Sequence, residues 1–241
     1  MKATERWHSE RMQQDIGLAR WGHYGTPVLV FPTAGGDAEE IERNHLVDAC
    51  GELIEGGRVK LYSCDSVAGR AMVSAIGPPA YRMWLLNQFH DCIRQEVLPA
   101  IYADLGGQRR QVIATGASIG AFNALAVLCR YPEVFSAAVG MSGTYRVERF
   151  YDGEFTDDLY FSSPVHFVPN LEGAQLDTLK QRFAILASGQ GAWEDVGESW
   201  HAGDVLGRKG VPNRVDAWGD EWPHEWPTWR RMLPQYLAEL C

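Results

Sequence analysis

The sequence predicts an α/β protein built on a mostly parallel sheet, and two features of the chain carry that prediction. Short, almost continuously apolar segments alternate along the chain with longer segments that have helical spacing. The apolar segments lack the alternation of a half-exposed strand, so helices should bury both faces of the sheet. Since neither a repeat nor a Gly/Ser-rich linker divides the 241 residues, we expect one domain over residues 1–241.

Six apolar segments are predicted to be the parallel strands. Each ends at the sheet edge where open α/β sheets bind their ligands. Ahead of them, residues 7–12 and 15–21 alternate loosely and are joined tightly, which predicts an antiparallel hairpin at the N-terminal edge. The six strands are expected at residues 28–31, 59–64, 111–115, 137–141, 182–187 and 214–218.

Helical spacing follows most of the strands. Pro99 predicts a kink or an end in the second helix, because proline removes a backbone hydrogen bond. Residues 145–179 break the rhythm and are rich in aromatic residues and proline. We interpret them as a short cap insertion over the carboxyl ends of the strands. The helices are expected at residues 37–52, 81–102, 121–130, 195–209 and 227–240.

Composition argues against several classes of function. Apolar residues make up 46% of the chain and the formal net charge is −9, which disfavours nucleic acids and acidic membranes as partners. We see neither an apolar run long enough to span a bilayer nor a signal peptide. The five cysteines are widely spaced and predict reduced thiols in a cytoplasmic protein. No metal-ligand or nucleotide-binding motif is present, so we expect neither a metal nor a cofactor.

The sharpest motif is Gly116-Ala117-Ser118-Ile119-Gly120, which lies between an expected strand and an expected helix. This is the context of a nucleophile elbow, a tight turn that presents a serine hydroxyl at the top of the sheet. The flanking glycines let the neighbouring backbone pass close to that turn. Ser118 is therefore the candidate nucleophile.

A serine nucleophile needs a base, and in this fold class the base follows the serine and the acid along the chain. Of the histidines after Ser118, His201 lies in an expected helix and His166 in the insertion. His224 follows the last expected strand, in a loop that can reach back to an elbow serine. We predict that His224 is the base.

The acid should lie in the loop after residues 182–187, where Glu194 and Asp195 are neighbours. Either carboxylate could orient the imidazole, and Asp195 is our first choice. Asp195 could equally cap the following helix. The oxyanion needs two backbone N–H donors; we expect them at Ile119 and at Gly35, with Ala34 as a close alternative.

Two further residues are candidate substrate contacts. Asp65 ends an expected strand at the active edge, where it could contact substrate or only cap the next loop. His166 could line the pocket or be a hydrogen-bonded loop histidine.

Six segments of the chain together form a recognisable pattern: residues 28–36, 61–66, 116–121, 141–145, 163–170 and 224–229. In these segments the chain resembles the bacterial putative-esterase family of the α/β-hydrolase superfamily, which is related to esterase D. The resemblance implies an α/β-hydrolase fold, a cofactor-independent hydrolase and a triad of Ser118, an acid at 194 or 195, and His224. Glu225 stands where the family often has Asp, a change that should affect packing more than chemistry.

These observations predict a serine hydrolase that cleaves a small-molecule carboxylic ester or thioester. An acyltransferase with the same triad is the first alternative, and a non-catalytic binding protein on this fold is the second. The sequence leaves the acyl group, the leaving group and a homo-oligomeric assembly open.

Overall fold

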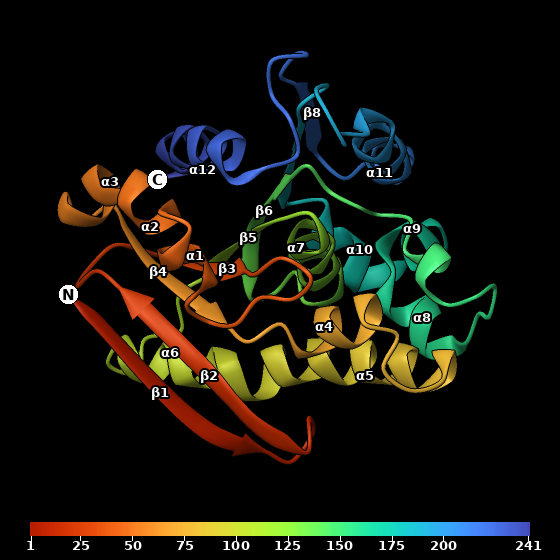
Figure 1. Ribbon diagram of the computed structural model, residues 1–241, viewed down its shortest axis with the longest axis horizontal. Coiled ribbons are helices and arrows are strands. Elements are labelled where there is room, and N and C mark those ends of the chain that lie inside the picture. The colour runs from red at the N-terminus through yellow and green to blue at the C-terminus, as the bar shows by residue number, and fades with distance from the viewer.

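An eight-stranded sheet runs through the protein in the computed structural model, which describes residues 1–241 (Figure 1). Its strand order is β1-β2-β4-β3-β5-β6-β7-β8. β2 is antiparallel to β1 and to β4, and all other neighbours are parallel. The expected mostly parallel sheet with an antiparallel N-terminal edge is confirmed. The strands are β1 (Lys2–Ser9), β2 (Gln14–Trp21), β3 (Thr26–Phe31), β4 (Val59–Cys64), β5 (Val112–Ala117), β6 (Phe135–Met141), β7 (Phe183–Ser188) and β8 (Asn213–Ala217).

The edge hairpin is longer than its sequence pattern predicts. β1 begins at Lys2, which pairs with Trp21 at the end of β2. Most residues of β1 are exposed or half-buried. An edge strand of this kind carries charges that discourage pairing with other chains, so it lacks the apolar signal that marks the inner strands.

Helices cover both faces of the sheet, and successive strand residues point alternately to two cores. Leu29 and Phe31 of β3 belong to one core, whereas Val28 and Val30 belong to the other. The first core lies under α4 (Val67–Val73), α5 (Pro79–Cys92), α6 (Leu98–Asp104), α7 (Ile119–Arg130) and α11 (Val196–Arg208). The second lies under α1 (Glu40–Arg43), α2 (Leu46–Ala49), α3 (Gly51–Glu55) and α12 (Trp226–Leu240), which Figure 1 shows on the opposite side of the sheet from α5 and α6.

Two of the expected helices differ in detail. Residues 37–52 form no single helix, because His45 adopts a left-handed conformation (φ 59°) that separates α1 from α2. The helix over residues 81–102 does not end at Pro99. A π-helical turn (Ile93–Val97) joins α5 to α6, and Pro99 lies in the first turn of α6, where its missing N–H is tolerated.

Residues 145–179 form five short helical segments that pack beside α5, α7 and α11. Tyr145, Tyr151 and Leu179 are fully buried in the first core, so the insertion shares its packing with the main body. The segments are η2 (Glu148–Phe150), α8 (Asp157–Ser162), α9 (Pro164–Phe167), η3 (Val168–Asn170) and α10 (Gly173–Leu179).

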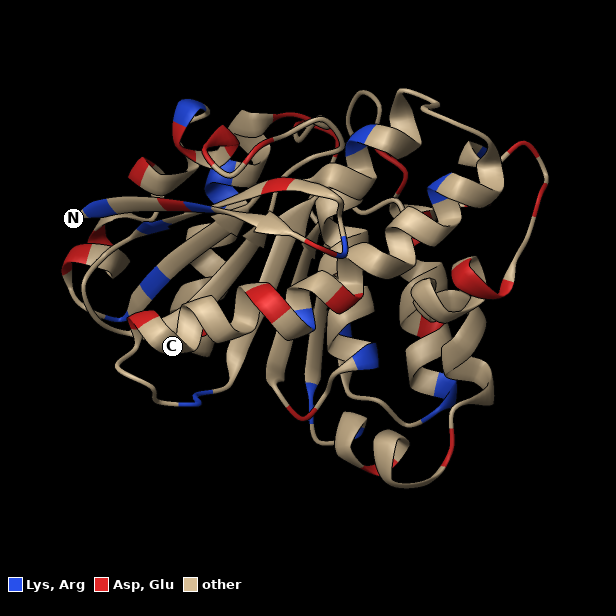
Figure 2. Ribbon diagram, turned by 90° about the horizontal axis from the view of Figure 1, so that it is seen from below, with Lys and Arg blue, Asp and Glu red and all other residues tan.

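Charged residues lie mainly on the helices and loops, whereas the central strands are almost free of charge (Figure 2). None of the helices combines the length and the apolar character that crossing a bilayer would require.

Candidate active site

Ser118 occupies a strained turn between β5 and α7. Its backbone lies at φ 57° and ψ −120°, a region that residues other than glycine rarely enter. Two glycines make the turn sterically possible. A Cβ atom on Gly116 would lie 2.5 Å from the carbonyl carbon of Gly120, and one on Gly120 would overlap the carbonyl oxygen of Phe31. The Gly-x-Ser-x-Gly motif therefore has the geometry of a nucleophile elbow.

The Ser118 hydroxyl is available for chemistry. Ser118 is half-buried, and its Oγ forms no hydrogen bond within the protein. Its backbone is fixed instead, because the Ser118 N–H donates to the carbonyl of Met141 (3.0 Å) and its carbonyl accepts from the N–H of Thr144 (3.4 Å). The elbow is thus tied to the end of the neighbouring strand β6.

His224 lies in the loop between β8 and α12 and pairs with Glu194. The two atoms nearest each other are His224 Nδ1 and Glu194 Oε2, 3.6 Å apart. The Glu194 side chain is 1% exposed and that of His224 is 24% exposed. The backbone also joins their two loops, because the His224 N–H donates to the carbonyl of Ala192 (3.0 Å). A buried carboxylate that faces one imidazole nitrogen can orient the ring as a base.

Asp195, the first choice for the acid from sequence, makes no contact with His224. Its carboxylate caps α11 by accepting a hydrogen bond from the N–H of Gly197 (2.9 Å). The side chain is 64% exposed and lies 3.7 Å from Arg146. The geometry therefore favours Glu194, the alternative that the sequence left open.

Three serines follow one another along the carboxyl edge of the sheet, and the sequence reasoning gave a role only to the first. Ser118, Ser142 and Ser188 lie at the ends of β5, β6 and β7. The hydroxyl of Ser142 donates to Glu194 Oε1 (2.5 Å), and that of Ser188 lies 3.1 Å from Glu194 Oε2. Their sequence signal is position alone: a polar residue where a buried strand ends.

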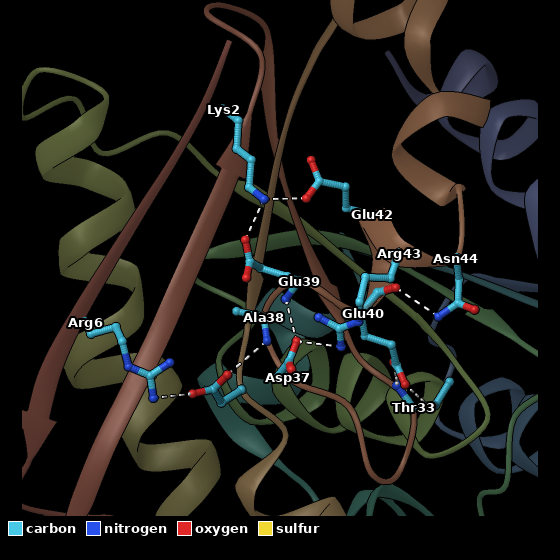
Figure 3. Close-up of polar contacts among 11 residues, drawn as sticks. Lys2, Arg6, Thr33, Asp37, Ala38, Glu39, Glu40, Glu42, Arg43 and Asn44 are labelled. Atoms are coloured by element: carbon cyan, nitrogen blue, oxygen red, sulfur yellow. Dashed lines mark hydrogen bonds and ion pairs between the residues drawn. The ribbon is translucent and has the colours of Figure 1, made fainter.

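The turn after β3 presents free backbone donors. The N–H of Gly36 donates to the carbonyl of Thr33 (3.1 Å), whereas the N–H groups of Ala34 and Gly35 have no acceptor in the protein. Glu40 fixes the turn by accepting hydrogen bonds from both the N–H and the hydroxyl of Thr33, each 2.7 Å long (Figure 3).

The second expected oxyanion donor also lies where a free N–H is required. Ile119 is the first residue of α7, and no N–H of a first helical turn has a partner within its own helix. Ile119 directly follows the candidate nucleophile, as an elbow oxyanion donor must.

The Asp65 carboxylate is occupied by contacts within the protein. Its buried carboxylate accepts hydrogen bonds from the N–H groups of Gly17 (2.8 Å) and Ala38 (2.9 Å), and it lies 3.5 Å from Arg6. These bonds tie the edge hairpin and the loop after β3 to the end of β4. The carboxylate does not cap the loop that follows Asp65, which was one of the two interpretations from sequence. Its contact with substrate stays a prediction.

His166 lies within the insertion, and both of its ring nitrogens have partners. Nε2 lies 2.8 Å from Glu148 Oε1, and Nδ1 lies 2.8 Å from Ser163 Oγ. Burial is the largest influence on the pKa of Glu148 and raises it. The hydrogen bond with His166, a backbone hydrogen bond and the nearby histidines together outweigh burial, so the pKa of that carboxyl lies below its ordinary value. No hydrogen bond or ion pair joins His166 to Ser118 or His224, and its contact with substrate stays a prediction.

Comparison with known proteins agrees with this geometry. Residues 55–240 match the profile of a family described as "Putative esterase", and no curated protein sequence matches the chain. Among solved structures, the chain is similar to a ferulic acid esterase, with a TM-score of 0.77 and 14% identity over 100% of this chain and 97% of the other.

Two further solved structures show the same likeness. An S-formylglutathione hydrolase from Agrobacterium tumefaciens has a TM-score of 0.74 and 12% identity, over 99% of this chain and 94% of the other. A fluorophosphonate-binding serine hydrolase from Staphylococcus aureus has a TM-score of 0.71 and 14% identity, over 100% of this chain and 98% of the other. At these identities the likeness shows the fold, and the α/β-hydrolase class expected from sequence is confirmed.

Proposed function

The chain belongs to the putative esterase family, and from that premise we propose that it is a serine hydrolase that cleaves carboxylic esters or thioesters through an acyl-enzyme on Ser118. The observation that carries the proposal is the pairing of the buried Glu194 carboxylate with the half-buried His224 ring. Glu194 Oε2 and His224 Nδ1 lie 3.6 Å apart, at the sheet edge where the Ser118 elbow stands. The triad is Ser118, His224 and Glu194, with Glu194 in the place for which Asp195 was first considered.

In the first half-reaction, Ser118 Oγ attacks the ester carbonyl carbon while His224 Nε2 takes the hydroxyl proton. Glu194, at Nδ1, fixes the ring and stabilises the imidazolium that forms. The N–H groups of Ile119 and Gly35 would hold the oxyanion, with Ala34 as the alternative second donor. The C–O bond to the leaving group then breaks, and His224 returns the proton to the departing alcohol or thiol.

In the second half-reaction, water attacks the acyl-enzyme, and His224 accepts the proton of that water. Collapse of the second tetrahedral intermediate releases the carboxylic acid and returns the proton to Ser118 Oγ. This chemistry needs no cofactor. An alcohol or amine that outcompeted water would make the same machinery an acyltransferase.

The test is Ser118→Ala, assayed with a p-nitrophenyl ester. We expect turnover to fall by several orders of magnitude while the fold persists, because the nucleophile is lost and the small side chain leaves the elbow intact. A fluorophosphonate probe should label the wild-type protein at Ser118 and leave the variant unlabelled. Retention of more than about a tenth of the activity in Ser118→Ala would disprove the assignment. Product analysis with an added acceptor alcohol separates hydrolysis from acyl transfer.

A further inference from the structure

Ser142 has a strained backbone, which a hydrogen bond from its N–H to the carbonyl of Ala187 (2.7 Å) holds in place. It directly follows β6, is 3% exposed and lies at φ 49°, in the left-handed region that favours glycine. Glycine at position 142 would adopt this conformation without strain. A strained residue that is not glycine is often retained for what its side chain does.

The Ser142 hydroxyl links an indole to the buried carboxylate of the candidate triad. Trp229 Nε1 donates to Ser142 Oγ (2.9 Å), and Ser142 Oγ donates to Glu194 Oε1 (2.5 Å). An indole N–H can only donate, so Ser142 Oγ accepts from Trp229 and gives its own proton to Glu194 Oε1.

The same indole also contacts the candidate base. Trp229 is 4% exposed in the first turn of α12, and its ring meets the ring of His224 edge to face, with centroids 5.2 Å apart and planes at 86°. Trp229 therefore packs against His224 directly and reaches Glu194 through Ser142. With Oε1 held by Ser142, the other carboxylate oxygen, Oε2, is the one that faces His224 Nδ1 at 3.6 Å.

We propose that Ser142 and Trp229 are positioning residues that hold Glu194 and His224 in their productive orientation. This inference rests on the proposed function, because it assigns a purpose to residues that touch the triad and not the substrate. Without the Ser142 hydroxyl, Oε1 would be a buried acceptor with no partner. The carboxylate would then rotate toward other donors and lose its alignment with the imidazole.

The experiment compares Ser142→Gly, Trp229→Phe and the double variant in an activated-ester assay. Glycine removes the hydroxyl and relieves the positive φ, but it also leaves the Trp229 N–H and Glu194 Oε1 without their hydrogen-bond partner. The thermal midpoint of Ser142→Gly is therefore measured beside its kcat, so that activity is compared only where the variant is folded. We expect its kcat to fall about 10- to 100-fold with KM within about twofold, as for loss of an outer-shell partner. Phenylalanine keeps an aromatic ring beside His224 and removes only the N–H donor, so Trp229→Phe should lose about 3- to 10-fold in kcat.

The losses of kcat in the two single variants should not add up in the double variant, a result that a merely structural role of these residues would not produce. The indole N–H acts on Glu194 only through Ser142, so the double variant should be no slower than Ser142→Gly alone. Trp226→Phe is the matched control. Trp226 packs against Trp229 at 5.0 Å on the same helix, but its N–H has no partner within the protein, so its kcat should stay within about twofold of wild type.

A folded Ser142→Gly protein with more than half of the wild-type kcat would overturn this inference, as would fully additive losses in the double variant. Ser118→Ala in the same assay separates this failure from that of the proposed function. An inactive Ser118→Ala beside an active Ser142→Gly removes the positioning role and leaves the triad standing. An active Ser118→Ala removes both.

Discussion

Glu194 and Asp195 are chain neighbours with opposite surroundings. Glu194 is buried between two serine hydroxyls and faces His224, whereas Asp195 is exposed and caps α11. An orienting acid must accept from the imidazole and stay ionised away from water, and of the two only Glu194 lies within reach of the ring.

Replacing each carboxylate by its amide tests this assignment. Glu194→Gln should lower kcat by about 10³- to 10⁴-fold, since an amide favours the wrong imidazole tautomer. Asp195→Asn should change kcat by no more than about twofold, because asparagine caps a helix as well as aspartate does. Both variants are measured with an activated ester beside wild type, and the reverse ranking would return the acid to Asp195.

Among the site residues, the sequence predicted those that directly follow an expected strand. Ser118 stood out because its motif joins an expected strand to an expected helix, and His224 because it follows the last strand. The sequence could not decide between Glu194 and Asp195. The two are adjacent, and the local backbone conformation decides which carboxylate points toward the sheet edge. Ser142 was missed because its role depends on Trp229, which is distant in sequence and adjacent only in the fold.

Between the elements α5 and α7, a buried histidine makes stability depend on pH. His90 is fully buried; its Nε2 lies 3.0 Å from Asn123 Oδ1, and its Nδ1 lies 3.4 Å from Arg130. Burial, reinforced by the charge of Arg130, lowers the pKa of His90 to about 3. The ring is therefore neutral in the folded protein at pH values where it is protonated in the unfolded chain.

This difference should destabilise the protein in mild acid. Between the unfolded pKa of about 6.5 and the folded pKa of about 3, the unfolded state binds the extra proton. The free energy of unfolding should therefore fall as the pH falls, by up to about 1.4 kcal/mol per pH unit from this group. Above about pH 6.5 the contribution of His90 to the pH dependence vanishes.

His90→Gln isolates the effect, because its amide can still donate to Asn123 but cannot titrate. In urea unfolding at pH 7 and pH 4.5, wild type should lose about 3 kcal/mol more than the variant between the two values. The carboxylates titrate equally in wild type and in His90→Gln, so their contributions to the pH dependence cancel when the two losses are compared. Equal losses would show that His90 does not carry the dependence.

Elements were easier to predict where the chain is continuously apolar. All six parallel strands were found to within a few residues. Burial on both faces gives β3 to β7 a clear sequence signal, whereas β8 is a half-buried strand at the edge of the sheet. The helix expected over residues 37–52 was wrong in its continuity, because the chain takes a left-handed turn at His45, where no glycine signals one in the sequence. α4 was missed because seven residues that include Gly69 have little helical signal.

Over the whole molecule, the two cores share one sheet, and the insertion belongs to the larger core. Residues of β3, β5, β6 and β7 point alternately into both cores. The insertion contributes Tyr145, Tyr151 and Leu179 to the same cluster as Phe122 of α7. Its sequence favoured a cap over the strand ends, whereas its helices lie mostly beside α5, α7 and α11.

This packing predicts that residues 145–179 unfold together with the sheet, as one cooperative unit. An independent lid would carry its own small core, but the buried side chains of this segment face α5 and α7. Amide hydrogen exchange under native conditions measures this directly, by comparing the slowest protected amides of α8–α10 with those of β5 and α7. We expect their opening free energies to agree within about 1 kcal/mol, and both to fall together in Leu179→Ala, which should cost about 2–5 kcal/mol as a buried leucine truncation. If the insertion opened several kcal/mol below the sheet, or if Leu179→Ala loosened only the insertion, residues 145–179 would be a separate unit and the single-domain prediction would be wrong.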